Sequence, residues 1–97
     1  MTSVRIRPEA DADLTAIFHY SYLNWGFAQA ELYVSQLTKM FARLAAEPRL
    51  GKAASARHPR LFRQSCGSHF VVFARDADGI EIIRVLHQRM DVEAQLD

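Results

Sequence analysis

The stretch that decides the fold is GSHFVVFARDADGIEIIRVLHQRMD, residues 67–91. Two runs rich in β-branched and aromatic residues, 69–75 and 80–87, flank the turn-like tetrapeptide DADG at residues 76–79. Both runs are apolar nearly throughout, which is typical of central strands that are covered on both faces. The sequence therefore predicts an antiparallel hairpin at the centre of a sheet.

A further strand and a loop come before this hairpin. Leu61–Cys66 is a short β-rich run, and the dipeptide Gly67-Ser68 joins it to the next strand with turn chemistry. Residues 51–60 are small and basic, are interrupted by Pro59 and follow no periodicity. They predict a surface loop inside the domain, followed by three antiparallel strands.

The N-terminal half has the period of two amphipathic helices. The first begins near Pro8, which suits the first turn of a helix, and acidic residues follow at the positive end of the helix dipole. It runs to the interruption NWG at residues 24–26, and the second helix then continues until Pro48 and Gly51 end the pattern. Residues at spacings of three and four mark the two buried faces: Leu14, Ile17, Phe18, Ser21 and Tyr22, then Ala30, Tyr33, Val34, Leu37, Phe41, Leu44 and Ala45.

The order of these elements defines the fold class. Residues 3–7 alternate between apolar and basic side chains, which predicts a short half-buried strand ahead of the first helix. Asp91 is of the residue type that caps a short C-terminal turn or helix. Residues 1–97 are thus expected to form one α+β domain of order β-α-α-β-β-β, with a helical hairpin packed on a small, mainly antiparallel sheet.

Composition and charge restrict the partners. Hydrophobic residues make up 49% and charged residues 24% of the chain, as in an ordinary globular domain. The formal charge of +1 gives no long-range field for phosphate backbones, so we expect no sequence-specific DNA binding by this chain. Cations do collect between residues 49 and 75, with no acidic residue among them: Arg49, Lys52, Arg57, Arg60, Arg63 and Arg75. This stretch is a candidate basic face.

Cysteine, histidine and the N-terminus indicate a compartment and exclude some site types. Cys66 is the one cysteine, so it forms no internal disulfide, and we expect it to be inert. His19, His58, His69 and His87 are scattered without metal-site spacing, so we expect no metal and no cofactor. Neither a signal peptide nor a membrane-spanning run is present, which predicts a cytoplasmic protein without a membrane partner.

The side chains with the most chemistry converge on the predicted sheet: Arg63, Arg84, His87 and Arg89. A site that cleaves RNA needs a proton acceptor and a proton donor near one phosphate, and His87 is the one obvious candidate for either role. Arg84 and His87 are three residues apart, so they share a strand face only where a bulge or the strand end intervenes. Glu81, which alternates to the same face as Ile83 and His87, is a further candidate.

Each of these residues has a structural alternative. Arg84 would equally serve in a salt bridge or lie over apolar surface, and His87 would bond to backbone. The aromatic set at the helix hairpin is predicted to pack in the core and hinge, the alternative being a platform for stacked bases: Trp25, Tyr20, Tyr22 and Tyr33.

The order and spacing of several motifs resemble one known family over essentially the whole chain. They are Ala12-Asp13-Leu14 with Ile17 and Tyr20, Trp25-Gly26 with Gln29-Ala30, Tyr33 with Leu37, Pro48 with Gly51, Gly67-Ser68-His69 with Val72-Phe73, and Ile83-Arg84-Val85-Leu86-His87-Gln88-Arg89-Met90-Asp91. In this order they are similar to the RelE/ParE toxin superfamily, on the ParE side.

This resemblance implies a toxin that poisons DNA gyrase by binding, without catalysis, and that a ParD-type antitoxin holds inactive. The antitoxin would fold a disordered tail onto the toxin through helix-in-groove and strand-addition contacts. We expect toxicity to depend on the C-terminal strand and tail, at Arg84, His87, Arg89, Met90 and Asp91. Contacts with the antitoxin are expected at Arg57, Arg60, Arg63, Tyr33 and Leu37.

Two other functions remain open. Ribosome-dependent mRNA nucleases of the RelE kind share the scaffold, but they often carry a Tyr or a second proton-moving residue near the C-terminus. Here His87 is followed by Gln88-Arg89-Met90, and all three tyrosines lie in the predicted helices. The third hypothesis is a degenerate toxin that is retained as an interaction module for the antitoxin.

Overall fold

The computed structural model describes residues 3–47 and 49–96. The predicted α+β fold is confirmed, and a short C-terminal helix completes it. The elements are β1 (Ser3–Ile6), α1 (Pro8–Trp25), α2 (Phe27–Ala46), β2 (Lys52–Ala53), β3 (Leu61–Cys66), β4 (His69–Asp76), β5 (Gly79–His87) and α3 (Val92–Leu96). The helix end predicted at Pro48 lies outside the described residues, and α2 has its last helical residue at Ala46.

The strands form one mixed sheet in the order β1-β5-β4-β3-β2. β3, β4 and β5 pair antiparallel, as predicted, and β1 joins β5 in parallel. The difference from prediction is β2, which pairs Lys52 with Arg63 and Ala53 with Phe62 inside the stretch that we expected to be loop. A two-residue strand is too short to leave a periodic signal in the sequence.

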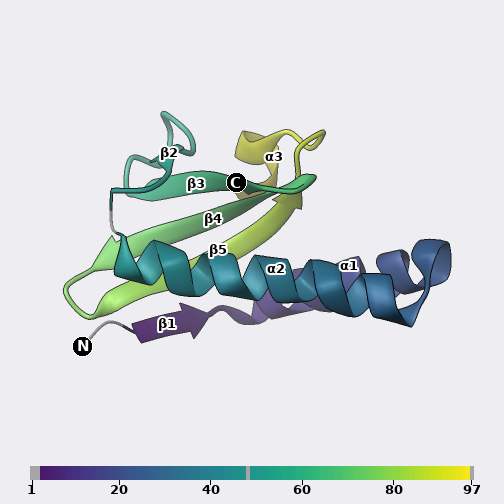
Figure 1. Cartoon of the computed structure of the whole chain (residues 1–97). Helices are drawn as coiled ribbons and strands as arrows, with labels where there is room; N and C mark the ends of the chain where they lie inside the picture. The colour runs from purple at the N-terminus through teal and green to yellow at the C-terminus, as the bar shows by residue number, and fades with distance from the viewer. Residues whose placement is uncertain (1–2, 48, 97) are drawn as a thin grey trace.

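The helical hairpin covers one face of the sheet, while α3 lies at the other side, near the ends of β3 and β5 (Figure 1). Pro8 is at the first position of α1, and Glu9 and Asp11 lie in its first turn, where the helix dipole favours negative charge. Gly26 separates the two helices. The tip of the hairpin projects beyond the strands (Figure 1).

The sheet therefore has a core on each face. The helix-side core joins residues of α1 and α2 to the sheet, and its buried members are Ala10, Leu14, Ile17, Leu37, Phe41, Leu44, Ala45, Val71, Phe73, Ile80, Ile82 and Val85. The α3-side core is smaller and consists of Val72, Ile83, Leu86 and Val92. β4 and β5 are central and contribute to both cores, which explains why their sequences are apolar nearly throughout.

A bulge in β5 changes which side chains share a face. Phe73 of β4 pairs with Ile82 and Val72 pairs with Arg84, so Ile83 has no cross-strand partner. Ile82 and Val85 consequently lie in the helix-side core, although they are three residues apart. Our expectation that Glu81, Ile83 and His87 share one face is therefore wrong, because the extra residue reverses the alternation.

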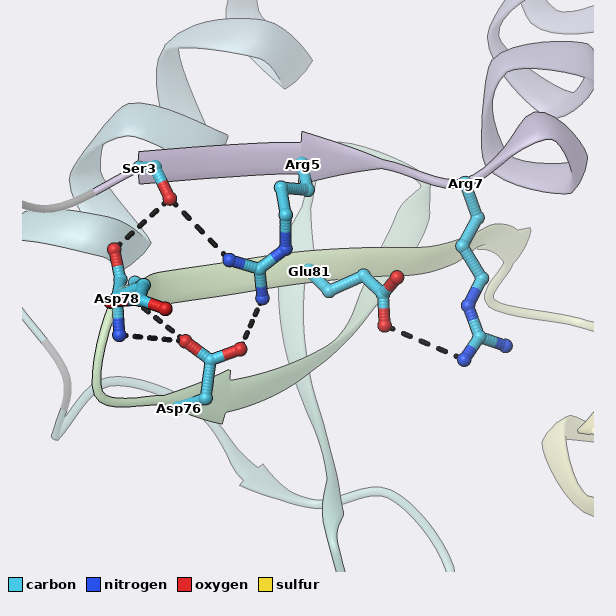
Figure 2. A network of polar contacts seen from close by, with 7 residues as sticks. Ser3, Arg5, Arg7, Asp76, Asp78 and Glu81 are labelled. Atoms are coloured by element: carbon cyan, nitrogen blue, oxygen red, sulfur yellow. Dashed lines mark hydrogen bonds and ion pairs between the residues drawn. The ribbon is translucent and has the colours of Figure 1, made fainter.

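β1 is held at the sheet edge by polar contacts around the β4–β5 turn (Figure 2). Arg5 pairs with Asp76, and Arg7 pairs with Glu81 at 3.4 Å. The Asp76 carboxylate also accepts the N–H groups of Asp78 and Gly79, and the first of these bonds contributes most to lowering the Asp76 pKa. These contacts clamp the N-terminal strand to the turn that joins the two central strands.

Gly79 is required for this arrangement. Its φ is +143°, and a Cβ there would lie 2.1 Å from the carbonyl oxygen of Ser3. A side chain at this position would collide with β1 backbone. Among the described residues, no helix is long and apolar enough to cross a membrane.

Candidate functional site

A pocket of about 640 Å³ lies between the helical hairpin and the ends of β4 and β5. Its walls are mostly apolar and come from α1, the start of α2 and the segment after β5: Ala16, Ile17, Tyr20, Trp25 and Met90. Its polar lining consists of Ser21, Gln29, Tyr33, Ser68, His69 and His87. Volume and lining are those of a site for a small ligand or for part of a peptide.

The polar side of the pocket is a chain of three side chains from three elements. The hydroxyl oxygen of Tyr33 lies 2.6 Å from Nδ1 of His69 and accepts the backbone N–H of Ser68 at 2.9 Å. The His69 ring meets the His87 ring edge to face, with centroids 5.2 Å apart. His87 Nδ1 accepts the backbone N–H of Arg89 at 3.1 Å.

These contacts constrain the tautomers of both rings. The Tyr33 oxygen accepts a bond from Ser68 and shares a second one with Nδ1 of His69, in which Tyr33 is the donor when His69 carries its proton on Nε2. Burial, and secondarily His87, lowers the pKa of His69, while Asp13 acts in the opposite direction. His87 accepts on Nδ1 and, when neutral, carries its proton on Nε2.

Hydrogen bonds hold the segment after β5 against this pocket. Gln88 donates its backbone N–H to Ser68 and its side-chain amide to the carbonyl of Gly67. Met90 donates its backbone N–H to the carbonyl of His87, which forms a turn. Of our five predicted toxicity residues, Arg89, Met90 and Asp91 follow β5, and the turn brings Met90 into one pocket with His87, the last residue of β5.

Arg84 has a different environment from His87. Its Nε and Nη2 donate to the two Asp13 oxygens at 2.7 and 2.9 Å, and the same carboxylate accepts the backbone N–H of Val85 at 2.9 Å. The hydrogen bond that Arg84 donates to Asp13 is the main cause that raises the pKa of the Arg84 guanidinium. The salt-bridge alternative for Arg84 is therefore observed, and the bulge does not bring Arg84 to His87.

The remaining tail residues divide into capping and exposed positions. Asp91 Oδ1 accepts the backbone N–H groups of Glu93 and Ala94, so it caps α3 as predicted. Arg89 and Met90 are exposed, and the Met90 side chain retains 47% of its accessible surface. They are the tail residues best placed to meet another molecule.

The residues predicted to bind an antitoxin do not form one surface. Arg57 and Arg60 are exposed on the loop before β3, and Arg63 stacks over Phe70, which packs against the α3-side core. Tyr33 lies in the pocket on the helix side. Leu37 is fully buried in the helix-side core, so including it as a contact residue was wrong. Its helical spacing marked a core position and not an exposed face.

The aromatic residues at the hairpin also depart from prediction. Trp25 and Tyr20 are 63% and 61% exposed, and their rings meet edge to face with centroids 5.8 Å apart. Tyr22, Leu23 and Phe27 are exposed as well, whereas Tyr33 is partly buried. Core packing is therefore wrong for three of the four aromatic side chains, and two of these, Tyr20 and Trp25, form an apolar rim at the pocket.

The free thiol of Cys66 is partly buried. Burial raises the pKa of the Cys66 thiol, whose Sγ contacts the backbone carbonyl of Gln36. Within residues 3–47 and 49–96, no group of three or more His, Cys, Asp or Glu side chains is placed to hold a metal ion.

His69 is the site residue that sequence reasoning missed. It was treated as one of four scattered histidines, yet β4 pairs it directly with His87. A regular hairpin centred on residues 76–79 would place His69 opposite Leu86, and the bulge moves its partner to His87. Tyr33 was named as a contact residue, but its bond to His69 joins helix to strand and leaves no local pattern.

Comparison with known proteins agrees with this fold and its motifs. Residues 4–92 match the family described as the ParE toxin of the type II toxin-antitoxin system, parDE. The chain is 40% identical over 92 residues to Toxin ParE1 of Mycobacterium tuberculosis, covering 94% of each chain. It is 38% identical to Toxin ParE1 of Caulobacter vibrioides over 99% of both chains, and 35% identical to Toxin ParE of Escherichia coli over 99% and 94%.

Solved structures show the same fold at lower identity. The chromosomal ParDE system from P. aeruginosa superposes with a TM-score of 0.78 at 21% identity, covering 90% of this chain and 96% of that one. The RelBE2 toxin-antitoxin complex from Mycobacterium tuberculosis gives a TM-score of 0.67 at 20% identity, covering 90% and 98%. The chain therefore has the RelE/ParE fold and belongs to the ParE toxin family of type II toxin-antitoxin systems.

Proposed function

We propose that this ParE-family toxin stops growth by binding and poisoning DNA gyrase, without catalysis, and that a ParD-type antitoxin neutralises it. The gyrase target follows from the resemblance to ParE toxins. The binding mechanism rests on one observation, which is the lack of a phosphate-holding cation in the pocket.

A nuclease site would need such a cation. Cleavage of RNA passes through a state with added charge on the phosphate, which nucleases neutralise with Arg, Lys or a metal ion. No Arg or Lys lines the pocket within the described part of the chain, and the Asp13 carboxylate holds Arg84. The apolar rim of Trp25 and Tyr20 instead suits a protein surface.

We place the toxic determinant in the tail, chiefly at Arg89 and Met90 with His87. Arg84 and Asp91 then act indirectly, by holding β5 and α3 in place. Truncation after Val85, the obvious test, would also remove the buried Leu86 and Val92 and so disturb the α3-side core. The double substitution Arg89→Ala/Met90→Ala is sharper, because both side chains are exposed.

The antitoxin partner is supported by family membership and by the fold likeness to the ParDE system of P. aeruginosa. We propose two contact regions for it. One is the basic loop with Arg57 and Arg60, continued by Arg63 on β3, which suits an acidic tail. The other is the pocket side with Tyr33.

The test is a gyrase assay with purified toxin, with and without the antitoxin encoded next to this gene. We expect cleaved-complex accumulation and loss of supercoiling that the antitoxin suppresses. Arg89→Ala/Met90→Ala should lose the effect, and Arg89→Ala alone, which leaves the pocket lining intact, should weaken it while still binding the antitoxin. Unchanged gyrase activity at an excess of toxin over gyrase would refute the gyrase proposal.

One observation favours the alternative, a RelE-like ribosome-dependent mRNA endoribonuclease. His69 beside His87 supplies the second proton-moving group that the sequence seemed to lack. If this were the activity, mRNA cleavage on ribosomes would be lost in His87→Ala and in His69→Ala alike. We expect no cleavage by the unaltered toxin.

A further inference from the structure

We propose that the pocket beside His69 and His87 binds an antitoxin segment that carries a carboxylate next to an apolar side chain. The carboxylate accepts hydrogen bonds from the two histidines, and the apolar side chain lies against the aromatic rim. This inference rests on the proposed function for its choice of partner. It adds the chemistry of the bound group and a dependence of affinity on pH.

Both histidines of the pocket use Nδ1 for hydrogen bonds within the toxin. Nδ1 of each histidine is already used, by the Tyr33 hydroxyl and by the Arg89 backbone N–H respectively. The Nε2 atoms have no hydrogen-bond partner within residues 3–47 and 49–96, although both residues line the pocket. Nε2 of His87 carries the proton of the neutral ring, and Nε2 of His69 is a donor whenever that ring is protonated, so both can donate to an acceptor from outside.

The pocket combines apolar walls with a few polar side chains. Ile17, Tyr20, Trp25 and Met90 surround the histidines, and the volume of about 640 Å³ exceeds that of one side chain. A segment of peptide with one anchor and one acceptor therefore fits better than a single small ion. Trp and Tyr at the rim are the residue types that dominate binding energy at protein interfaces.

Charge distinguishes a carboxylate from the other acceptors. No Asp or Glu lines the pocket within the described chain, so an incoming carboxylate meets no repulsion from its walls. No Lys or Arg lines it either, which disfavours a nucleic-acid backbone with several phosphates. When a histidine takes up a proton, its hydrogen bond to a neighbouring carboxylate becomes stronger. A hydrogen bond to a neutral carbonyl is strengthened less by the same proton.

The histidines make such binding sensitive to pH. The groups facing them are Tyr33 of α2, Asp13 of α1, Cys66, which pairs with His69 from β3, and the Arg89 backbone N–H. In the free toxin, burial lowers the pKa of His69. A bound carboxylate would raise it again, so binding is accompanied by proton uptake and tightens as the pH falls.

A pocket-filling substitution tests the location. Ala16→Trp places a large side chain in the pocket from an exposed helix position, and Ala28→Trp makes the same change at an exposed position outside it. Calorimetry with the full-length antitoxin should show affinity weakened by about tenfold or more for Ala16→Trp. Ala28→Trp should stay within about twofold. Equal affinity of both variants would overturn the proposed location.

Proton uptake tests the chemistry. Between about pH 8 and pH 6, the affinity of the unaltered toxin should rise about three- to fivefold, because binding raises the lowered pKa of His69. His69→Gln/His87→Gln keeps donors but cannot take up a proton, so its affinity should follow pH much less. An equal pH response in both proteins would overturn the carboxylate. If the unaltered toxin does not bind the antitoxin at all, the proposed partner fails, whatever the gyrase assay shows.

Discussion

Replacing Asp13 by Ala should destabilise this protein more than any single surface change. One carboxylate accepts three hydrogen bonds, at 2.7 and 2.9 Å from the Arg84 guanidinium and at 2.9 Å from the Val85 N–H. The Asp13 and Arg84 side chains retain only 16% and 24% of their accessible surface. The substitution would leave a cation and a backbone donor without their partner in a poorly hydrated place.

The magnitude follows from these contacts. Removing one partner of a fully buried ion pair costs about 3–5 kcal/mol, and an exposed pair contributes about 0–1 kcal/mol. This pair lies between these limits, and the unpaired Val85 N–H adds about 1–3 kcal/mol. We therefore expect Asp13→Ala to lower the free energy of unfolding by about 3 kcal/mol, and Arg84→Met, which keeps the Val85 bond, by about 1–2 kcal/mol.

Urea unfolding followed by far-ultraviolet circular dichroism measures this loss. Trp25 fluorescence would be a poor probe, because its side chain is 63% exposed in the native state. The matched control is Arg43→Met, which breaks a surface pair with Glu47 at 3.6 Å and should cost less than about 0.5 kcal/mol. If Asp13→Ala cost no more than Arg43→Met, the Asp13 carboxylate would not hold β5 as we argue.

Three further predictions concern other parts of the molecule. Gly79→Ala should lower the free energy of unfolding by at least about 2 kcal/mol and speed hydrogen exchange in β1, because its Cβ would strike Ser3. Gly26→Ala is the control: its φ is also positive, at +89°, but no atom lies within 4 Å of the added Cβ, so urea unfolding should show a loss of only about 1 kcal/mol. The pKa of His69 is lowered in the folded state, so below about pH 6.5 the unfolded chain binds more protons than the folded protein does. The urea midpoint should therefore fall as the pH drops below this value, and it should fall less in His69→Gln. Cys66 should react with iodoacetamide more slowly in the native state than in urea, since burial raises its pKa; equal rates would contradict this.

The elements with a local period could be predicted from sequence. The alternation in residues 3–7, the helical spacing on both sides of Gly26, and the apolar runs around residues 76–79 each arise within one element. Their types and order are confirmed, because burial on one face or two imposes the pattern in the helices and the central strands. The expectation that the first strand is half-buried is wrong, since all four residues of β1 are exposed. β2 was missed because its two residues are paired by β3 and not by a pattern of their own.

The site was less predictable because it depends on register. The bulge at Ile83 reverses the alternation that would have placed Glu81 and His87 on the same face of the sheet. The residue types around Ile83 do not indicate a bulge. Arg84 finds its carboxylate on α1, 71 residues earlier in the chain. Interactions over such separations are set by how elements dock, which helical or strand periodicity does not specify.

The exposed aromatic rim has a geometric cause that connects the fold to the proposed function. β1 pairs with β5 only as far as Ile82, so α1 starts part-way along β5 and Asp13 lies opposite Val85. Residues 14–25 then rise about 18 Å along the helix, whereas β5 continues for two residues, or about 7 Å. The end of α1 therefore has no sheet beneath it.

An overhanging helix end could be polar, and here it is not. Tyr20, Leu23 and Trp25 are each more than half exposed, and Phe27 continues the apolar surface on α2. Tyr20 and Trp25 also line the pocket, so exposed apolar side chains gather at this end of the hairpin, as they do at interaction sites on soluble proteins. Catalysis would not require that surface, whereas a toxin that is neutralised by a folding tail and acts by docking would. Tyr20→Ser/Trp25→Ser should accordingly leave the unfolding midpoint nearly unchanged while weakening the antitoxin complex, and strong destabilisation instead would return these side chains to a structural role.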